Sequence, residues 1–336
     1  MAETVLVTGG TGYVAGWCIV QLLQRGYAVR TTVRSPAKQA DVRAAVKAGG
    51  ADDSRLSFYI ADLTADAGWD AAAAGCDYVL HVASPLGGAG STAGADAFIT
   101  PARDGTLRVL RAAVGAGVKR VVMTSAAAVA RPPAGSKVVA DETVWSDPAT
   151  RKFDPYRLSK VLAERAAWDF MAREGGATSF ATILPGAVFG PVLSPHALGS
   201  ANVIKGLLNG RPGAIPRLAL WIVDVRDLAD LHIRAMTAPQ AAGQRFLATG
   251  EFMWMSDVAA TLRKALGPRA AKVPTRRLPD LAFRALALFN PQFRMLAQEV
   301  GRRNPVSSDK ARRMLGFAPR PAAQTVIDCA NSLAGI

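Results

Sequence analysis

A tyrosine and a lysine four residues apart, Tyr156 and Lys160, are the side chains whose types and spacing point most directly to chemistry. The segment that holds them predicts a helix up to about Glu174, and residues four apart lie on one helix face. A nearby positive charge favours the ionised form of a phenol, so we expect Lys160 to lower the pKa of Tyr156 toward the working pH. The pair predicts a general acid, although the same spacing also occurs on ordinary solvated helices.

A glycine-rich turn lies near the start of the chain, well before this pair. The β-branched run 4–8 predicts a strand, the residues from Gly9 to Gly16 follow at once, and a helical pattern continues to Gln24. Glycines at such a turn let the backbone approach a pyrophosphate, which then sits on the free N–H groups of the helix start. The turn therefore predicts dinucleotide binding, with contacts from Thr8, Gly9, Thr11, Gly12, Tyr13 and Val14.

The end of the next predicted strand, 28–33, indicates which dinucleotide is bound. An NAD-selective site usually has an acidic residue here for the ribose hydroxyls, whereas a 2′-phosphate needs arginine. No acidic residue occurs between Glu3 and Asp41, and Arg34 and Lys38 follow the strand. We therefore predict that these two cations bind a 2′-phosphate and that the cofactor is NADP(H).

Further strands are predicted at 56–60, 77–82, 120–125 and 180–184, with helices between them, including one at about 96–116. This alternation predicts an α/β fold with a Rossmann-like, doubly wound parallel sheet, whose ligands lie at the carboxyl ends of the strands. Pro185 should end ladder pairing in the sixth strand. The further cofactor contacts expected at these ends are Asp62, Leu63, Val82, Ala83, Ser84, Thr124, Pro185, Gly186 and Val188.

Two regions are expected. Residues 1–188 with 221–237 should form the NADP-binding domain, the latter segment returning to the main sheet as strand and helix. Residues 189–220 with 238–336 should form a smaller, C-terminal substrate lobe, and 189–221 a lid with one helical piece near 202–208. Apolar side chains that are either pocket walls or core are Phe189, Leu198, Trp221, Met253 and Trp254.

The composition excludes several other classes of protein. The net charge is +14, but the basic residues are spread along the chain without interleaved aromatics, which disfavours a nucleic-acid partner. No apolar run reaches the length of a membrane span and no basic signal region precedes the first strand, so we expect a cytoplasmic protein without a membrane partner. We also expect a monomer or homodimer. Three scattered cysteines, three histidines and no Gly-x-Ser-x-Gly disfavour disulfides, metal sites and serine hydrolysis.

Taken together, the motifs resemble the extended short-chain dehydrogenase/reductase family, within the NAD-dependent epimerase/dehydratase superfamily. The branch is that of dihydroflavonol reductases and aldehyde or carbonyl reductases. The resemblance covers roughly the first 235 residues. The segments that carry it are 8–16, 33–34, 61–63, 81–85, 121–125, 141–145, 156–160, 184–191 and 223–229.

The resemblance implies a division of labour among three catalytic side chains. The tyrosine protonates a carbonyl oxygen, the lysine lowers the pKa of the tyrosine and holds the nicotinamide ribose, and a serine hydrogen-bonds the substrate oxygen. Tyr156 and Lys160 match, but the family's Thr-Ser-Ser-Ala reads Thr124-Ser125-Ala126-Ala127 here, so the catalytic serine aligns with Ala126. We expect Ser125 to substitute, which requires the strand end to bend. The alternatives are Thr124, another group or a water molecule, or weakened activity.

The function expected from these observations is NADPH-dependent reduction of a small-molecule aldehyde or ketone, reversible as oxidation of the alcohol, with Tyr156 as general acid. Two alternatives stay open: an NAD-dependent sugar-nucleotide epimerase or dehydratase, and a catalytically weak NADP-binding sensor or scaffold protein.

Overall fold

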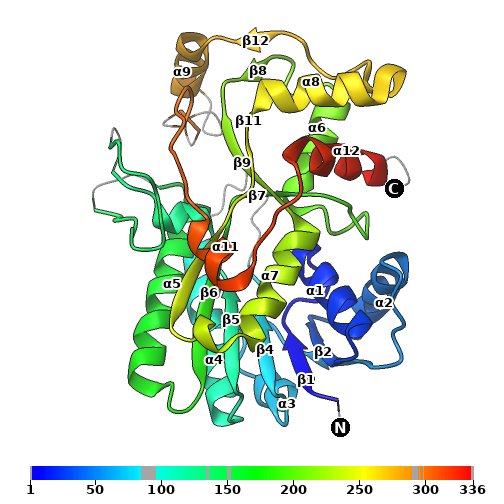
Figure 1. Ribbon diagram of the computed structural model, residues 1–336, viewed down its shortest axis with the longest axis vertical. Coiled ribbons are helices and arrows are strands. Elements are labelled where there is room, and N and C mark those ends of the chain that lie inside the picture. The colour runs from blue at the N-terminus through cyan, green and yellow to red at the C-terminus, as the bar shows by residue number, and fades with distance from the viewer. Residues whose placement is uncertain are drawn as a thin grey trace.

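Apolar, β-branched runs form a central parallel sheet (Figure 1). The computed structural model describes residues 2–84, 96–133, 136–149, 153–289, 294, 296–297 and 299–333; the glycine-rich segment 86–95 lies outside them. The strand order is β10-β6-β5-β4-β1-β2-β3. These strands are β1 (Thr4–Val7), β2 (Ala28–Val33), β3 (Leu56–Ile60), β4 (Tyr78–His81), β5 (Arg120–Thr124), β6 (Ser179–Pro185) and β10 (Gln244–Ala248).

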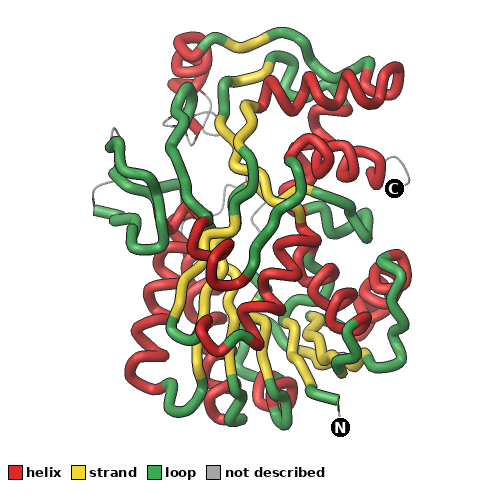
Figure 2. Tube along the Cα trace, in the orientation of Figure 1, coloured by secondary structure: helices red, strands yellow, loops and turns green. Residues whose placement is uncertain are grey.

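Helices cover both faces of this sheet, as a parallel sheet requires (Figure 2). One face packs on α1 (Tyr13–Gln24), α2 (Gln39–Ala48) and α7 (Val225–Thr237), and the other on α3 (Trp69–Ala73), α4 (Asp96–Gly115) and α5 (Pro155–Glu174). The strands β1 to β6 and the helices α1, α4 and α5 lie where the sequence predicts them. The Rossmann-like fold class is therefore confirmed.

The seventh strand of the sheet comes from the C-terminal third of the chain. β10 runs parallel to β6, with Gln244 opposite Ala181 and Ala248 opposite Pro185. The sequence places residues 238–336 in the substrate lobe, so the position of β10 corrects that assignment. β6 ends at Pro185, as expected of a residue without a backbone N–H.

A second sheet stands beyond the carboxyl ends of the first. It contains β7 (Ala187–Phe189), β9 (Ala219–Asp224) and β11 (Phe252–Trp254). The prediction that the strand at 221 returns to the main sheet is wrong, because β9 pairs with β7, Ala187 lying opposite Ile222. Gly186 allows this approach, since a Cβ there would lie 2.2 Å from the Trp221 carbonyl oxygen. Of the segment 221–237, only the helix α7 packs on the main sheet, as predicted.

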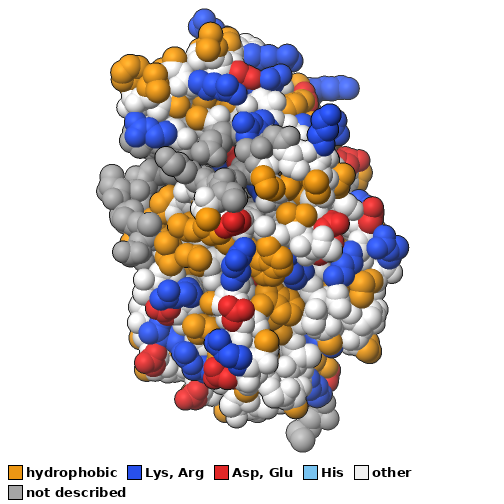
Figure 3. Space-filling view, turned by 90° about the vertical axis from the view of Figure 1, so that its left-hand side faces the viewer, with side chains coloured by type: hydrophobic (Ala, Val, Ile, Leu, Met, Phe, Trp, Pro, Cys, Tyr) orange, Lys and Arg blue, Asp and Glu red, His pale blue; other side chains and the backbone are white. Residues whose placement is uncertain are grey.

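The remaining elements surround this second sheet or follow it in the chain. They are β8 (Ile215–Pro216), β12 (Arg277–Leu278), α6 (Asn202–Leu208), α8 (Met255–Leu266), α9 (Asp280–Phe289), α11 (Asp309–Leu315) and α12 (Ala322–Leu333). No helix among the described residues is long and apolar enough to cross a membrane. On the face drawn in Figure 3, lysine and arginine side chains lie in separate groups, among acidic and apolar ones. The three cysteines are free and buried.

The buried Asp224 side chain, at the end of β9 and the start of α7, allows a test of stability. Asp224, which is fully buried, accepts hydrogen bonds from the backbone and guanidinium of Arg226 and from the Thr325 hydroxyl. Asp224→Ala should lower the free energy of unfolding by about 2–4 kcal/mol, because α7 loses its N-cap and the buried Thr325 hydroxyl loses its acceptor, while Arg226 keeps its pair with Asp328. Urea denaturation measures this. Asp230→Ala, which breaks more exposed pairs with Arg25 and Arg234, should cost under about 1 kcal/mol. Equal losses would contradict the assignment.

Candidate active site

The glycine turn after β1 has the shape of a dinucleotide cradle. Gly9 has a φ of +73°, and a Cβ there would lie 2.9 Å from the Ala83 Cβ. A Cβ on Gly10 would lie 2.3 Å from the Thr31 hydroxyl oxygen. Gly12 begins α1 without a side-chain cap, so the first N–H groups of the helix have no partner within it. These features fit the phosphates of a dinucleotide.

The Thr8 hydroxyl fixes the shape of this cradle from below. It accepts hydrogen bonds from the backbone N–H groups of Val82 and Ala83, at 3.1 and 3.0 Å, and bonds the His81 Nδ1 at 3.0 Å. The His81 Nε2 bonds the Thr106 hydroxyl at 3.1 Å. Burial lowers the pKa of His81 to about 3, so the ring is neutral. The predicted contacts Thr8, Val82 and Ala83 therefore hold two strand ends together.

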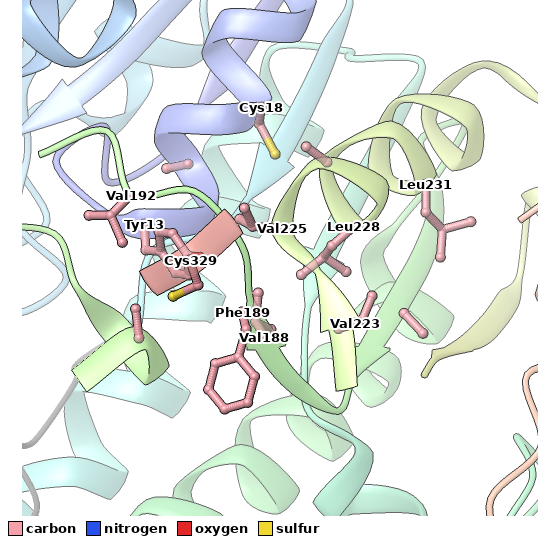
Figure 4. Packing of buried hydrophobic residues seen from close by; sticks show 14 of the residues in the cluster. Tyr13, Cys18, Val188, Phe189, Val192, Val223, Val225, Leu228, Leu231 and Cys329 are labelled. Carbon is pink, nitrogen blue, oxygen red and sulfur yellow. The ribbon is translucent and has the colours of Figure 1, made fainter. Parts of the chain in front are cut away.

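The Tyr13 side chain belongs to the core, although the sequence places it at the cofactor. It is 6% exposed, and its hydroxyl donates to the Gly190 carbonyl at 2.7 Å. Figure 4 shows its ring beside Cys329 and close to Phe189 and Val188. Burial raises the pKa of Tyr13. Its backbone N–H, at the start of α1, is the group that can meet a phosphate. Phe189, 1% exposed, is likewise core and not a pocket wall.

A pocket of about 160 Å³ opens beside the cradle, and its lining includes Arg34 and Lys38, the residues predicted to bind a 2′-phosphate. Lys38 Nζ lies 2.9 Å from a carboxylate oxygen of Asp41. The exposed guanidinium of Arg34 has no hydrogen bond or ion pair with the described part of the chain. Four residues of the expected lid also line this pocket: Leu193, Ser194, His196 and Ala197. The sequence offers no local signal for that contact, which depends on the lid folding back over α1 and α2.

The residues after β3 are partly engaged by the protein. One Asp62 carboxylate oxygen accepts hydrogen bonds from the backbone and hydroxyl of Thr64, which with the charge of Arg34 hold its pKa low. Leu63 packs against α4 at Gly105. A Cβ added to Gly105 would lie 2.6 Å from the Cβ of Leu63. Both residues lie at the carboxyl edge of the sheet, on the side of Arg34.

The Tyr-x-x-x-Lys pair lies in the first turns of α5. Asp154 caps this helix by accepting a hydrogen bond from the Arg157 N–H at 3.0 Å. Lys160 is 5% exposed, its Nζ lies 3.5 Å from the Thr124 carbonyl oxygen and 6.0 Å from the centre of the Tyr156 ring. One helix face therefore presents the phenol and the ammonium, as the spacing predicts.

The electrostatics of this pair differ from the prediction. Burial raises the pKa of Tyr156, with Asp154 adding to the rise. Burial also lowers the pKa of Lys160 to about 8, which the Glu164 charge partly opposes. The expected lowering of the tyrosine pKa is absent here because the ammonium lies at the Thr124 carbonyl and desolvation of the phenolate outweighs its attraction.

The two side chains at the end of β5 point to opposite faces of the sheet. The Thr124 hydroxyl bonds the His232 Nε2 at 2.7 Å, and His232 Nδ1 bonds the Leu228 carbonyl. Burial lowers the pKa of His232 to about 4, so this ring is also neutral. Ser125 is 2% exposed, and its hydroxyl donates to the Glu164 carboxylate. The Ser125 hydroxyl is therefore directed into the protein.

The end of β6 and the second sheet complete the surroundings. The Gly186 N–H donates to the Ala248 carbonyl at 3.1 Å, and Pro185 is buried. The Trp221 ring, an expected pocket wall, lies 5.4 Å from the ring of Phe252, over which the Arg303 guanidinium is placed at 4.4 Å. Phe252 and Arg303 are residues that the sequence did not single out.

Comparison with known proteins agrees with this architecture. The model of the NAD dependent epimerase/dehydratase family matches residues 5–248. Cinnamoyl-CoA reductase CAD2 of Medicago truncatula is 38% identical over 253 residues, covering 74% of this chain and 76% of its own length. Dihydroflavonol 4-reductase of Zea mays is 34% identical over 267 residues, covering 77% and 73%.

A solved structure extends the similarity to nearly the whole chain. Gre2 of Candida albicans, solved in complex with NADPH, has a TM-score of 0.79 and 27% identity, covering 99% of both chains. This protein belongs to the NAD dependent epimerase/dehydratase family. The expected family is thereby confirmed, together with a nicotinamide dinucleotide as its cofactor.

The free guanidinium beside the cradle leads to a prediction about nucleotide affinity. Arg34→Ala should weaken binding of 2′,5′-ADP by about 10- to 100-fold, the loss expected for hydrogen bonds to a charged group. Binding of ADP, which lacks the 2′-phosphate, should change little. Isothermal titration calorimetry measures both. Arg43→Ala, which removes an exposed arginine of α2 paired with Asp53, is the control. Equal weakening of both nucleotides would contradict the assignment.

Proposed function

We propose that this protein is an NADPH-dependent reductase of aldehydes or ketones. The observation that carries the proposal is the pairing of Tyr156 and Lys160 on one face of α5, with Lys160 at the carboxyl end of β5. That edge of the sheet also holds the glycine cradle and Arg34. When bound, NADPH supplies the hydride, and the protein supplies orientation and a proton.

Tyr156 is proposed to be the proton donor to the carbonyl oxygen. Its pKa is raised by burial, so the phenol keeps its proton until the oxygen gains negative charge. Lys160 is mostly protonated at neutral pH, since its pKa is about 8. Its charge then stabilises the phenolate that remains, and we place the nicotinamide ribose within reach of the same ammonium.

The group that polarises the carbonyl is proposed not to be Ser125. Its hydroxyl is buried and bound to Glu164, so it would have to break that hydrogen bond to reach a substrate. Ala126, which the family resemblance places at the position of the catalytic serine, is partly exposed and has no polar side chain. Tyr156 and a bound water molecule then donate the hydrogen bonds to the carbonyl oxygen of the substrate. Loss of one such donor typically costs about a hundred- to a thousandfold in rate.

The alternatives lead to different outcomes in assays. A weak NADP-binding sensor is favoured by Ala126 and would bind NADPH with no turnover. A sugar-nucleotide epimerase or dehydratase would convert UDP-sugars with bound NAD and would not consume NADPH.

One prediction from this proposal concerns the proton donor. Wild-type protein should oxidise NADPH in the presence of some members of a panel of aromatic and aliphatic aldehydes and ketones, and NADH less well. Tyr156→Phe should lower kcat by about a hundredfold or more, because the acid is lost, while NADPH affinity stays unchanged. Absorbance at the nicotinamide band follows turnover. Tyr27→Phe, remote from α5, is the control. An unaffected rate in Tyr156→Phe would refute the assignment.

The second prediction is a gain of function. Ala126→Ser adds a hydroxyl at the position that the family resemblance gives to the catalytic serine, so kcat should rise, by up to about a hundredfold. Ser125→Ala should leave kcat/KM within a few-fold, since this hydroxyl serves Glu164. A larger loss in Ser125→Ala than in Tyr156→Phe would reverse the two roles.

A further inference from the structure

A buried polar cluster lies between α5 and the sheet, behind the proposed reacting groups. Its centre is Glu164, which is fully buried and lies one helical turn after Lys160. The Glu164 carboxylate accepts a hydrogen bond from the Ser125 hydroxyl on one oxygen. The other oxygen accepts from the Thr182 hydroxyl at 2.9 Å, the Arg245 Nε at 2.9 Å and the Trp168 Nε1 at 3.3 Å. Four donors thus converge on one side chain.

Three of these donors come from three adjacent strands. Ser125 follows β5, Thr182 lies in β6, and Arg245 lies directly opposite Thr182 in β10. The Lys160 ammonium meets the carbonyl of Thr124, the residue before Ser125. Lys160 and Glu164, which share one face of α5, therefore bind Thr124 and Ser125, two successive residues at the end of β5.

The cluster also brings buried charges together. Lys160 and Arg245 are 5% and 7% exposed; Glu164 forms an ion pair with Arg245 and lies one helical turn after Lys160 in α5. Arg245 further donates to the carbonyls of Glu142 and Val144 and stacks on the Trp145 ring at 3.6 Å. A cation that is buried without an opposite charge is strongly unfavourable, so these groups depend on Glu164.

In the part of the chain that the structure describes, the groups near the Lys160 ammonium other than Glu164 carry no charge. Tyr156 is an uncharged phenol, His81 is neutral, and Thr124 offers a carbonyl. Burial drives Lys160 toward its neutral form, and the Glu164 charge is what opposes this. Removal of that charge should therefore make the lysine lose its proton at a lower pH.

We propose that Glu164 is a positioning residue for the reduction: its carboxylate keeps the Lys160 ammonium charged and holds the end of β5 against α5. It contacts neither substrate nor cofactor, since it is fully buried. This inference rests on the proposed function, because Glu164 acts through Lys160. It also gives Ser125 a role, as a donor to Glu164 and not to the substrate.

The test is the pH dependence of kcat/KM in Glu164→Gln, which keeps the shape of the side chain and removes its charge. Protonated Lys160 supports the rate, so activity falls as pH rises through its pKa. In Glu164→Gln this fall should occur about one pH unit lower, while below it the rate approaches that of wild type. Thr182→Val removes a donor to the same carboxylate and keeps the charge, so its alkaline midpoint should not move. An equal loss at every pH in Glu164→Gln would overturn the proposal.

A second measurement needs no turnover. Protein labelled with ¹³Cε-lysine is titrated from pH 6 to 10 by NMR, with Lys160→Arg used to assign the Lys160 signal. The midpoint of Lys160 should fall in Glu164→Gln and stay in Thr182→Val. An unchanged midpoint overturns the inference whether or not any carbonyl is reduced. A lowered midpoint in a protein without reductase activity upholds the charge coupling and refutes the proposed function.

A further variant guards against unfolding of Glu164→Gln. The double variant Glu164→Gln/Arg245→Met removes the carboxylate and its guanidinium together, so no unpaired charge is buried between the strands. The Lys160 midpoint should still lie below that of the single variant Arg245→Met. Equal midpoints in these two proteins would overturn the proposal.

Discussion

Backbone polar groups at the carboxyl edge of a parallel sheet must find partners after the ladder ends, and this need shapes the whole site. The amides that follow β4 bond the Thr8 hydroxyl, the last carbonyl of β5 meets Lys160, and the N–H of Gly186 bonds the end of β10. The N–H groups at the start of α1 are the ones with no such partner in the helix. Ligand-binding capacity therefore lies where the protein has not satisfied its own backbone.

Local patterns sufficed for much of the fold. β-branched runs separated by helical ones give the strands β1 to β6, and a spacing of four puts Tyr156 and Lys160 on one face. The residues of a short strand do not by themselves determine which sheet edge the strand joins. β10 pairs with residues more than sixty positions earlier, and β9 turns to β7 because Gly186 lets the chains approach. Neither choice has a signature in the segment itself.

Side-chain direction limited the prediction of the site. Tyr13 and Ser125 were expected to face ligands, yet their hydroxyls bond Gly190, 177 positions away, and Glu164, 39 positions away. A polar residue at a strand or helix end has two faces available, and tertiary partners decide between them. Glu164 did carry a signal that could have been used: an acidic residue four places after Lys160, on a helix face with few other polar residues.

The late position of β10 bears on how the chain is made. Until residues 244–248 leave the ribosome, β6 is an open edge, and Glu164 lacks the guanidinium of Arg245. Synthesis proceeds at about 5–20 residues per second, so the segment from Pro185 to Ala248 keeps this edge uncovered for several seconds. An unpaired strand edge is a template for association with other chains. In a nascent chain of this protein, the nucleotide-binding half is thus largely synthesised for a period in which the β6 edge of its sheet has no partner strand.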